Sequence, residues 1–185
     1  MTDKLLSESE SKMKKAVEAL KRNLATIRTG RASPGLIEGL MVDYFGTSMP
    51  LNQLANISVP EARLLAIQPW DKQAISLVEK AILQANLGLN PSNDGTLIRI
   101  PIPPLTDERR QELVKMVQKR VEEGRVSIRN ARRDSMDQTR SLKKNKEISE
   151  DQERRTEERL QKLTDDYVRR INDAGAAKEK DLIET

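Results

Sequence analysis

Apolar residues recur at helical spacing through the first thirty positions of the chain. From Leu6 to Ile27 they are separated by seven, four or three residues, and charged side chains occupy most positions between them. Such a heptad-like stripe is typical of an amphipathic helix that buries one narrow seam. Gly30, which can adopt the left-handed conformation that often closes a helix, is predicted to be its end.

Two further stripes follow in the last eighty residues. One runs from Leu113 to Leu142 after the helix-capping residue Thr106, and it predicts a helix of about 40 residues, about 60 Å long. Ser149 and Gln152 form a capping-box pattern that predicts the start of a third helix. Its stripe extends from Leu160 to Leu182. Because no single stripe of this kind is stable in water, we expect the three helices to form one bundle, residues 1–30 and 105–185.

Residues 31–104 have a different pattern and are predicted to be an inserted domain. All eight prolines lie there, and strand-like runs occupy 41–51 and 55–70, the latter read as two strands broken at Pro60–Glu61. A short helix is predicted after Asp71, followed by a turn at 93–95 and a last strand. Trp70 is expected in the core of this small β/α/β domain. The fold class is therefore α+β, an elongated three-helix bundle with a small β/α/β insertion.

Composition agrees with an elongated molecule and argues against an enzyme. Only 36% of the 185 residues are hydrophobic, 34% are charged and 2% are aromatic, which is too polar for a compact globule of this length. The chain contains no histidine and no cysteine, so the commonest general base and the strongest nucleophile are missing. No nucleotide-binding glycine motif occurs. We expect no catalytic residue, no metal and no cofactor; the absence of cysteine and of a long apolar run suits a cytoplasmic protein without a membrane span.

Positive charge is concentrated in one segment of the second long helix. Residues 125–146 hold eight Lys/Arg and two Asp, a net charge of 8 − 2 = +6, whereas the whole chain carries +4. A helical projection directs Asp134 and Asp137 away from the apolar seam and places six of these cations on one face beside it. The six are Arg125, Arg129, Arg132, Arg133, Arg140 and Lys143. We expect too few acidic residues nearby to neutralise most of the cations on this face. The alternative is a solvated face without a ligand.

The dominance of arginine on this face favours phosphate contact. A guanidinium group can bind a phosphate through two parallel hydrogen bonds. The predicted bundle has almost no aromatic side chains on which bases could stack, so recognition of RNA shape and phosphate is favoured over base reading.

Four stretches resemble the ribosome recycling factor family: "IRTGRASP" (27–34), "ANISVPEARLLAIQPWDK" (55–72), "LGLNPSNDGTLIRIPIPPLTDERR" (87–110) and "IRNARRD" (128–134). The similarity extends over the whole chain, with Phe45 standing where the family often has tyrosine. The resemblance implies an L-shaped, transfer-RNA-like molecule with a hinge, acting as a monomer. It implies binding to the large-subunit ribosomal RNA of the post-termination ribosome. With elongation factor G and GTP, such a factor splits the subunits, which are recycled with the messenger and the deacylated transfer RNA.

The same motifs indicate which residues act. Arg129 and Arg132 are the first candidates for RNA binding, followed by the neighbouring motif positions Arg133, Arg28 and Arg31. The two chain crossings between the domains are the predicted hinge: Gly30, Arg31, Pro104 and Leu105. A helical protein-interaction or assembly module without RNA is the alternative, although it would need exposed apolar grooves that these narrow stripes do not predict.

Overall fold

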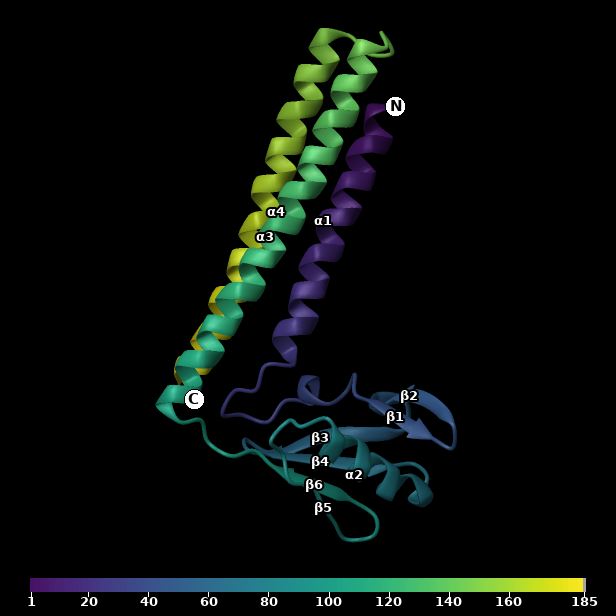
Figure 1. Cartoon of the computed structure of the whole chain (residues 1–185), viewed down its shortest axis with the longest axis vertical. Coiled ribbons are helices and arrows are strands. Elements are labelled where there is room, and N and C mark those ends of the chain that lie inside the picture. The colour runs from purple at the N-terminus through teal and green to yellow at the C-terminus, as the bar shows by residue number, and fades with distance from the viewer. Residues whose placement is uncertain (185) are drawn as a thin grey trace. The chain divides into compact units, whose positions relative to one another are not determined.

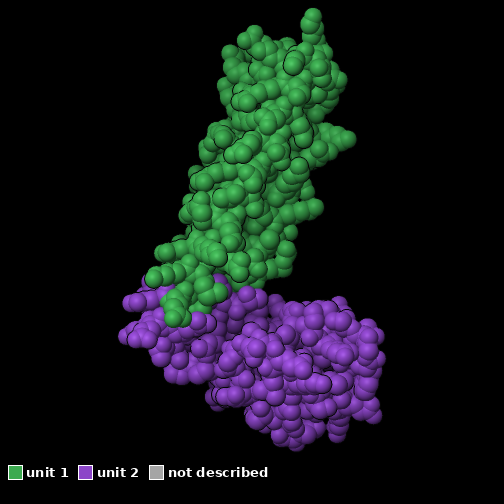
Figure 2. Space-filling model, in the orientation of Figure 1, with its two compact units in different colours: residues 1–24, 112–180 green, residues 25–111, 181–185 purple. Residues whose placement is uncertain are grey.

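The computed structural model describes residues 1–184 and divides into two compact units. The bundle unit comprises residues 1–24 and 112–180, and the small unit comprises 25–111 and 181–185 (Figure 2). Three helices carry the bundle unit, α1 (Thr2–Ala25), α3 (Asp107–Lys144) and α4 (Glu150–Glu184), and they run side by side (Figure 1). None of the helices within residues 1–184 is long and apolar enough to cross a membrane.

The three helices bury the predicted stripes against one another. Met13 of α1, Val117 and Ile128 of α3, and Leu160 and Ile171 of α4 are all fully buried. Each helix therefore supplies the apolar surface that the other two lack, and the prediction of a three-helix bundle is confirmed.

Glycine allows α3 and α4 to approach closely at two places. A Cβ atom on Gly175 of α4 would lie 2.4 Å from Val121 Cγ2, and one on Gly124 of α3 would lie 3.0 Å from Ile171 Cδ1. The first distance is shorter than any carbon contact that packing tolerates, so a side chain at Gly175 would force the helices or Val121 to move.

Two of the predicted helix ends are confirmed and one is wrong. Thr106 Oγ1 accepts from the Arg109 amide at 3.1 Å, which confirms the cap before α3. Ser149 Oγ accepts from the Gln152 amide at 3.1 Å, and Gln152 Oε1 accepts from the Ser149 amide at 2.9 Å, a complete capping box. Helix α1, however, ends at Ala25, five residues before Gly30, and the described glycines with positive φ do not include Gly30. The Thr29 hydroxyl instead accepts from the Arg31 amide at 3.2 Å, a local turn that competes with helix.

The small unit is built on an antiparallel sheet of four strands in the order β3–β4–β6–β5 (Figure 1). These strands are β3 (Ala55–Glu61), β4 (Leu64–Pro69), β5 (Ser92–Asn93) and β6 (Ile98–Pro101). A separate hairpin joins β1 (Met41–Tyr44) to β2 (Thr47–Pro50), and helix α2 (Ile75–Gln84) packs on β1. The aliphatic core is fully buried at Val42, Leu65, Ile67, Val78, Ile98 and Ile100.

Pro60 does not end its strand as predicted. Strand β3 continues to Glu61, with a register shift between Ser58 and Glu61. This is possible because β3 is an edge strand, where a residue without an amide proton leaves no ladder bond unmade.

The prediction that Trp70 lies in the core is also wrong. Its side chain is 68% exposed, while the preceding residue, Pro69, is buried. Successive residues of an extended strand point to opposite faces, so burial of Pro69 turns Trp70 outward. Beside it, the Tyr44 hydroxyl donates to Asp71 Oδ2 at 2.7 Å, and Asp71 Oδ1 accepts from the Gln73 amide as the predicted cap before α2.

Candidate nucleic-acid interface

Six cations along α3 form what we call the α3 basic strip: Arg125, Arg129, Arg132, Arg133, Arg140 and Lys143. Four of the six reach across to α4. Arg125 Nε donates to Asn172 Oδ1 at 2.8 Å, and Arg132 Nη1 donates to Gln161 Oε1 at 2.7 Å. Further along, Arg140 and Lys143 form ion pairs with α4 glutamates. The strip therefore follows the outer side of the α3–α4 pair.

Arg132 is the most firmly oriented member of the strip. Its partner Gln161 is itself held, because the Gln161 amide nitrogen donates to Asp165 Oδ1 at 2.9 Å. The Arg132 side chain is half-buried, and its Nε is buried without an acceptor among the described residues. A guanidinium fixed in this way loses little rotational freedom when it binds an anion.

Arg129 and Arg133 are the most accessible cations near the middle of the strip. The Arg129 side chain is 54% exposed, with Nη1 3.5 Å from Glu122 Oε1. Arg133 is exposed and forms no ion pair with any residue in 1–184. Together with Arg132 they provide three neighbouring guanidinium groups in three different environments.

The expectation that most of this face lacks compensating acids is wrong. Glu122 pairs with Arg125 at 2.9 Å and with Arg129 at 3.5 Å. Arg140 lies 3.7 Å from both Asp137 and Glu157, and Lys143 lies 3.6 Å from Glu153. The projection missed these pairs because Glu122 precedes the basic segment, because Asp137 reaches Arg140 one turn on, and because α4 contributes the other acids.

These ion pairs are compatible with the predicted binding of phosphate by the strip. Most of the paired side chains are exposed to solvent, where a pair contributes little free energy. A phosphate can therefore replace the carboxylate at small cost, while the carboxylate keeps the arginine extended until then.

Arg28 and Arg31 belong to the small unit, so the structure does not group them with the strip on α3. Arg28 is half-buried, and its Nη1 donates to the Pro103 carbonyl at 3.4 Å. Burial, followed by repulsion from Arg109, lowers the pKa of Arg28, but arginine stays charged at neutral pH. Arg31 is exposed.

The predicted hinge residues lie on two crossings that run close together within the small unit. The Arg28–Pro103 hydrogen bond joins the crossings directly. The Ala32 amide donates to the Ala62 carbonyl, and the Ile102 amide donates to the Arg63 carbonyl, each at 2.7 Å. Both crossings are thus anchored to the same β3–β4 turn. Gly30 and Leu105 are buried, whereas Pro104 is exposed.

Comparison with known proteins agrees with this combination of helical bundle and sheet domain. The family model described as ribosome recycling factor matches residues 20–183. The chain belongs to the ribosome recycling factor family. The resemblance inferred from the sequence motifs is thereby confirmed.

Relatives and solved structures cover almost the whole chain. The ribosome-recycling factor of Thermomicrobium roseum is 56% identical over 184 residues, spanning 100% of both proteins. That of Halalkalibacterium halodurans is 53% identical with the same coverage. A solution structure of the ribosome recycling factor is 46% identical with a TM-score of 0.80, covering 100% of this chain and 98% of that one.

A second similar structure shows a family member in a larger assembly. It represents the T. thermophilus ribosome recycling factor and the E. coli elongation factor G bound to the E. coli post-termination complex. This chain is 44% identical to it with a TM-score of 0.71, and the alignment covers 98% of each chain.

Glu122 provides a test of the strip as an anion-binding surface. Glu122→Gln should bind large ribosomal subunits more tightly at low salt, because Arg125 and Arg129 no longer share their charge with a carboxylate. The affinity should rise by up to about fivefold, because an exposed ion pair contributes at most about 1 kcal/mol. Affinity would be measured by co-sedimentation.

Glu123→Gln is the matched control, since Glu123 pairs with Arg120 at 3.2 Å and not with the strip. It should change affinity less than Glu122→Gln. Weaker binding by Glu122→Gln would show that the carboxylate itself contributes to the contact.

Proposed function

We propose that this protein is a translation factor that binds the post-termination ribosome through large-subunit ribosomal RNA. Together with elongation factor G and GTP, it splits the subunits, so that they, the messenger RNA and the deacylated transfer RNA are recycled. Membership of the ribosome recycling factor family over the full chain is the observation that carries this proposal. The structure of a relative with elongation factor G on the post-termination complex supports the choice of partners.

The α3 basic strip is the proposed RNA contact, with Arg129 and Arg132 at its centre and Arg133 beside them. Arg28 and Arg31 are proposed as further RNA contacts from the small unit. Phosphate is the group that three adjacent guanidinium groups recognise best. Base stacking is disfavoured, because Tyr167, an aromatic residue of the bundle unit, is buried with its ring 4.4 Å from the Arg170 guanidinium carbon.

The protein itself makes and breaks no bond in this proposal. Hydrolysis of GTP belongs to elongation factor G, and this chain acts as a monomeric cytoplasmic binding partner without a cofactor. Its role is to convert the partner's hydrolysis into separation of the subunits.

Arg132→Gln tests the proposed function together with its RNA contact. The wild-type protein should reduce the light scattering of ribosomes only when elongation factor G and GTP are both present. Arg132→Gln should bind large subunits at least about tenfold more weakly, because a charge-assisted hydrogen bond contributes about 1.5–3 kcal/mol. Splitting at limiting concentration should fall in proportion.

Arg120→Gln is the control for this variant, because Arg120 lies on the same helix and pairs with Glu123 instead of α4. Both variants should keep wild-type circular dichroism. Full affinity and splitting by a folded Arg132→Gln would refute the assignment of Arg132. A wild-type protein that never splits ribosomes would refute the function.

The two chain crossings are the proposed hinge, at Gly30 and Arg31 on one side and Pro104 and Leu105 on the other. The bundle domain, residues 1–30 and 105–185, would turn as one body against the domain of residues 31–104. Two short, anchored crossings restrict motion to a few axes, unlike a single flexible linker. Directed motion of this kind is what a factor needs if a partner's GTP hydrolysis is to move it.

A reversible disulfide tests the hinge, since the chain has no native cysteine. Cysteine pairs with one member on each domain near the crossings would be screened for one that oxidises completely. The oxidised protein should still bind ribosomes but lose most of its splitting activity, and reduction should restore that activity. Splitting at the full rate while the two domains are locked would show that the crossings only connect them.

A further inference from the structure

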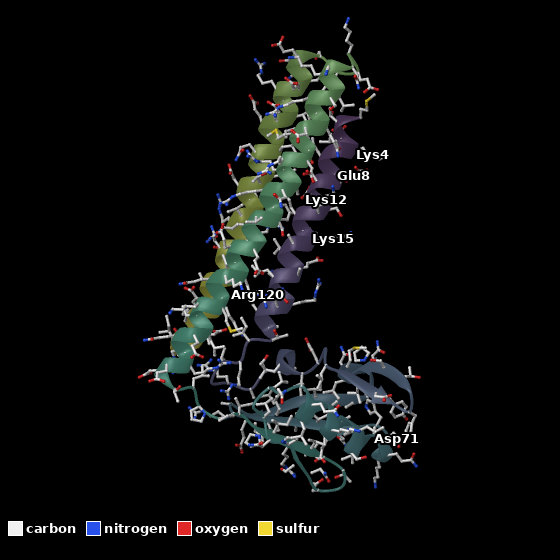
Figure 3. All side chains as sticks on the ribbon, viewed as in Figure 1. Lys4, Glu8, Lys12, Lys15, Asp71 and Arg120 are labelled. Carbon is white, nitrogen blue, oxygen red and sulfur yellow. The ribbon has the colours of Figure 1, made fainter. Side chains whose placement is uncertain are left out.

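Helix α1 carries a second concentration of positive charge, which we call the α1 lysine patch: Lys12, Lys14, Lys15, Lys21 and Arg22. Residues 12–22 contain these five cations and one acid, Glu18, a net charge of 5 − 1 = +4, which equals the charge of the whole chain. All five side chains are exposed. Lys12, Lys15 and Arg22 lie on the half of α1 opposite the buried Met13, Val17 and Leu20, whereas Lys14 and Lys21 lie on one flank of that seam. Figure 3 labels Lys12 and Lys15 along this helix.

The patch is uncompensated, in contrast to the α3 basic strip. None of its five cations forms an ion pair with a residue in 1–184. Two ion pairs of α1 involve other residues, Lys4 with Glu8 at 4.0 Å and Asp3 with Arg159 at 3.4 Å. The helix dipole favours Lys21 and Arg22, which are near the C-terminus of α1. It does not account for Lys12, Lys14 and Lys15 in the middle of the helix, where Lys12 and Lys15 are like charges one turn apart.

The patch and the strip lie on different sides of the bundle unit. The strip is bonded to α4 through Asn172 and Gln161, so it follows the α3–α4 side. The patch occupies the outward face of α1, whose inner face packs towards α3, as shown by Leu20 near Gly124. A single RNA helix lying along the strip would therefore not cover the patch.

The chemistry of the patch favours phosphate over an acidic protein surface. Four of its five cations are lysines, which bind phosphate as mobile point charges. Protein interfaces are depleted in lysine and depend on buried aromatic or apolar anchors. The patch provides no such anchor, because the apolar side chains beside it on α1 are the small alanines at 16 and 19.

We propose that the α1 lysine patch is a second phosphate-contact surface, which binds an RNA segment other than the one bound by the α3 basic strip. This proposal rests on the proposed function, because the RNA is that of the large ribosomal subunit. The bundle would then lie between two RNA segments. Free lysines would attract RNA at long range, and the held arginines would fix the final position.

The first test compares two triple variants with the same loss of charge. Lys12→Gln/Lys14→Gln/Lys15→Gln removes the centre of the patch. The control, Lys115→Gln/Lys119→Gln/Lys162→Gln, removes three exposed lysines of α3 and α4 that likewise form no ion pair with a described residue. Binding to large ribosomal subunits would be measured over a range of salt concentrations.

We expect the patch variant to lose at least about tenfold in affinity at low salt. The slope of log affinity against log salt should become shallower by about 2 to 3, because each phosphate contact contributes about 0.9. The control should change less than half as much. Equal changes in the two variants would overturn the proposal, since net charge alone would then explain the effect.

The second test identifies what the patch touches. Lys15→Cys and, for comparison, Arg133→Cys would be labelled with an aryl azide and irradiated on large subunits. We expect both positions to crosslink to ribosomal RNA, at different segments. A crosslink from position 15 to a ribosomal protein, to the same RNA segment as position 133, or to nothing would overturn the proposal.

The outcomes separate this inference from the function on which it rests. If the wild-type protein fails to bind large subunits, the proposed function fails. If the wild-type protein binds and the two triple variants behave alike, the α1 lysine patch fails and the function stands.

Discussion

The close approach of α3 and α4 is the constraint on which the candidate RNA interface depends. Gly175 and Gly124 leave no room for a side chain against Val121 and Ile171, so the two backbones come nearer than larger residues would allow. At this separation, Asn172 and Gln161 of α4 reach Arg125 and Arg132 of α3. Packing in the seam therefore determines where the charges on the surface point.

Two kinds of positive surface result from this arrangement. The α3 basic strip consists mainly of arginines that are extended and held by carboxylates and amides, so binding costs little side-chain entropy. The α1 lysine patch is exposed and without ion pairs among the described residues, and its effect depends on charge and distance more than on geometry. A protein that must find a large RNA surface and then occupy one position on it has a use for both.

The sequence predicted the features that depend on periodicity and local capping. The three helical stripes, the capping box at Ser149, the strand-like run at 41–51 and the short helix after Asp71 were all predictable because a few neighbouring residues determine them. The family, and with it the function, could be inferred from long motifs in the correct order.

Features that depend on distant residues were not predictable in the same way. The predicted position of Trp70 was wrong because Pro69 points into the aliphatic core, and strand alternation then directs Trp70 to solvent. The predicted end of α1 was wrong: the helix stops at Ala25, and the Thr29 hydroxyl accepts from the Arg31 amide in a turn beyond it. The compensation of the α3 strip was missed because Glu122 precedes the projected segment, because Asp137 reaches Arg140 one turn on, and because the other acids come from α4.

We propose that α4 orients the arginines of α3 for phosphate binding, and Gln161→Ala tests this proposal most directly. Gln161 holds Arg132 but carries no charge, so its loss should weaken binding to large subunits severalfold while leaving the salt slope unchanged. Gln138→Ala, an exposed neutral change on α3, serves as the control and should have no effect. Unaltered affinity in a folded Gln161→Ala variant would contradict the account, because the charge of Arg132 would then suffice without its support from α4.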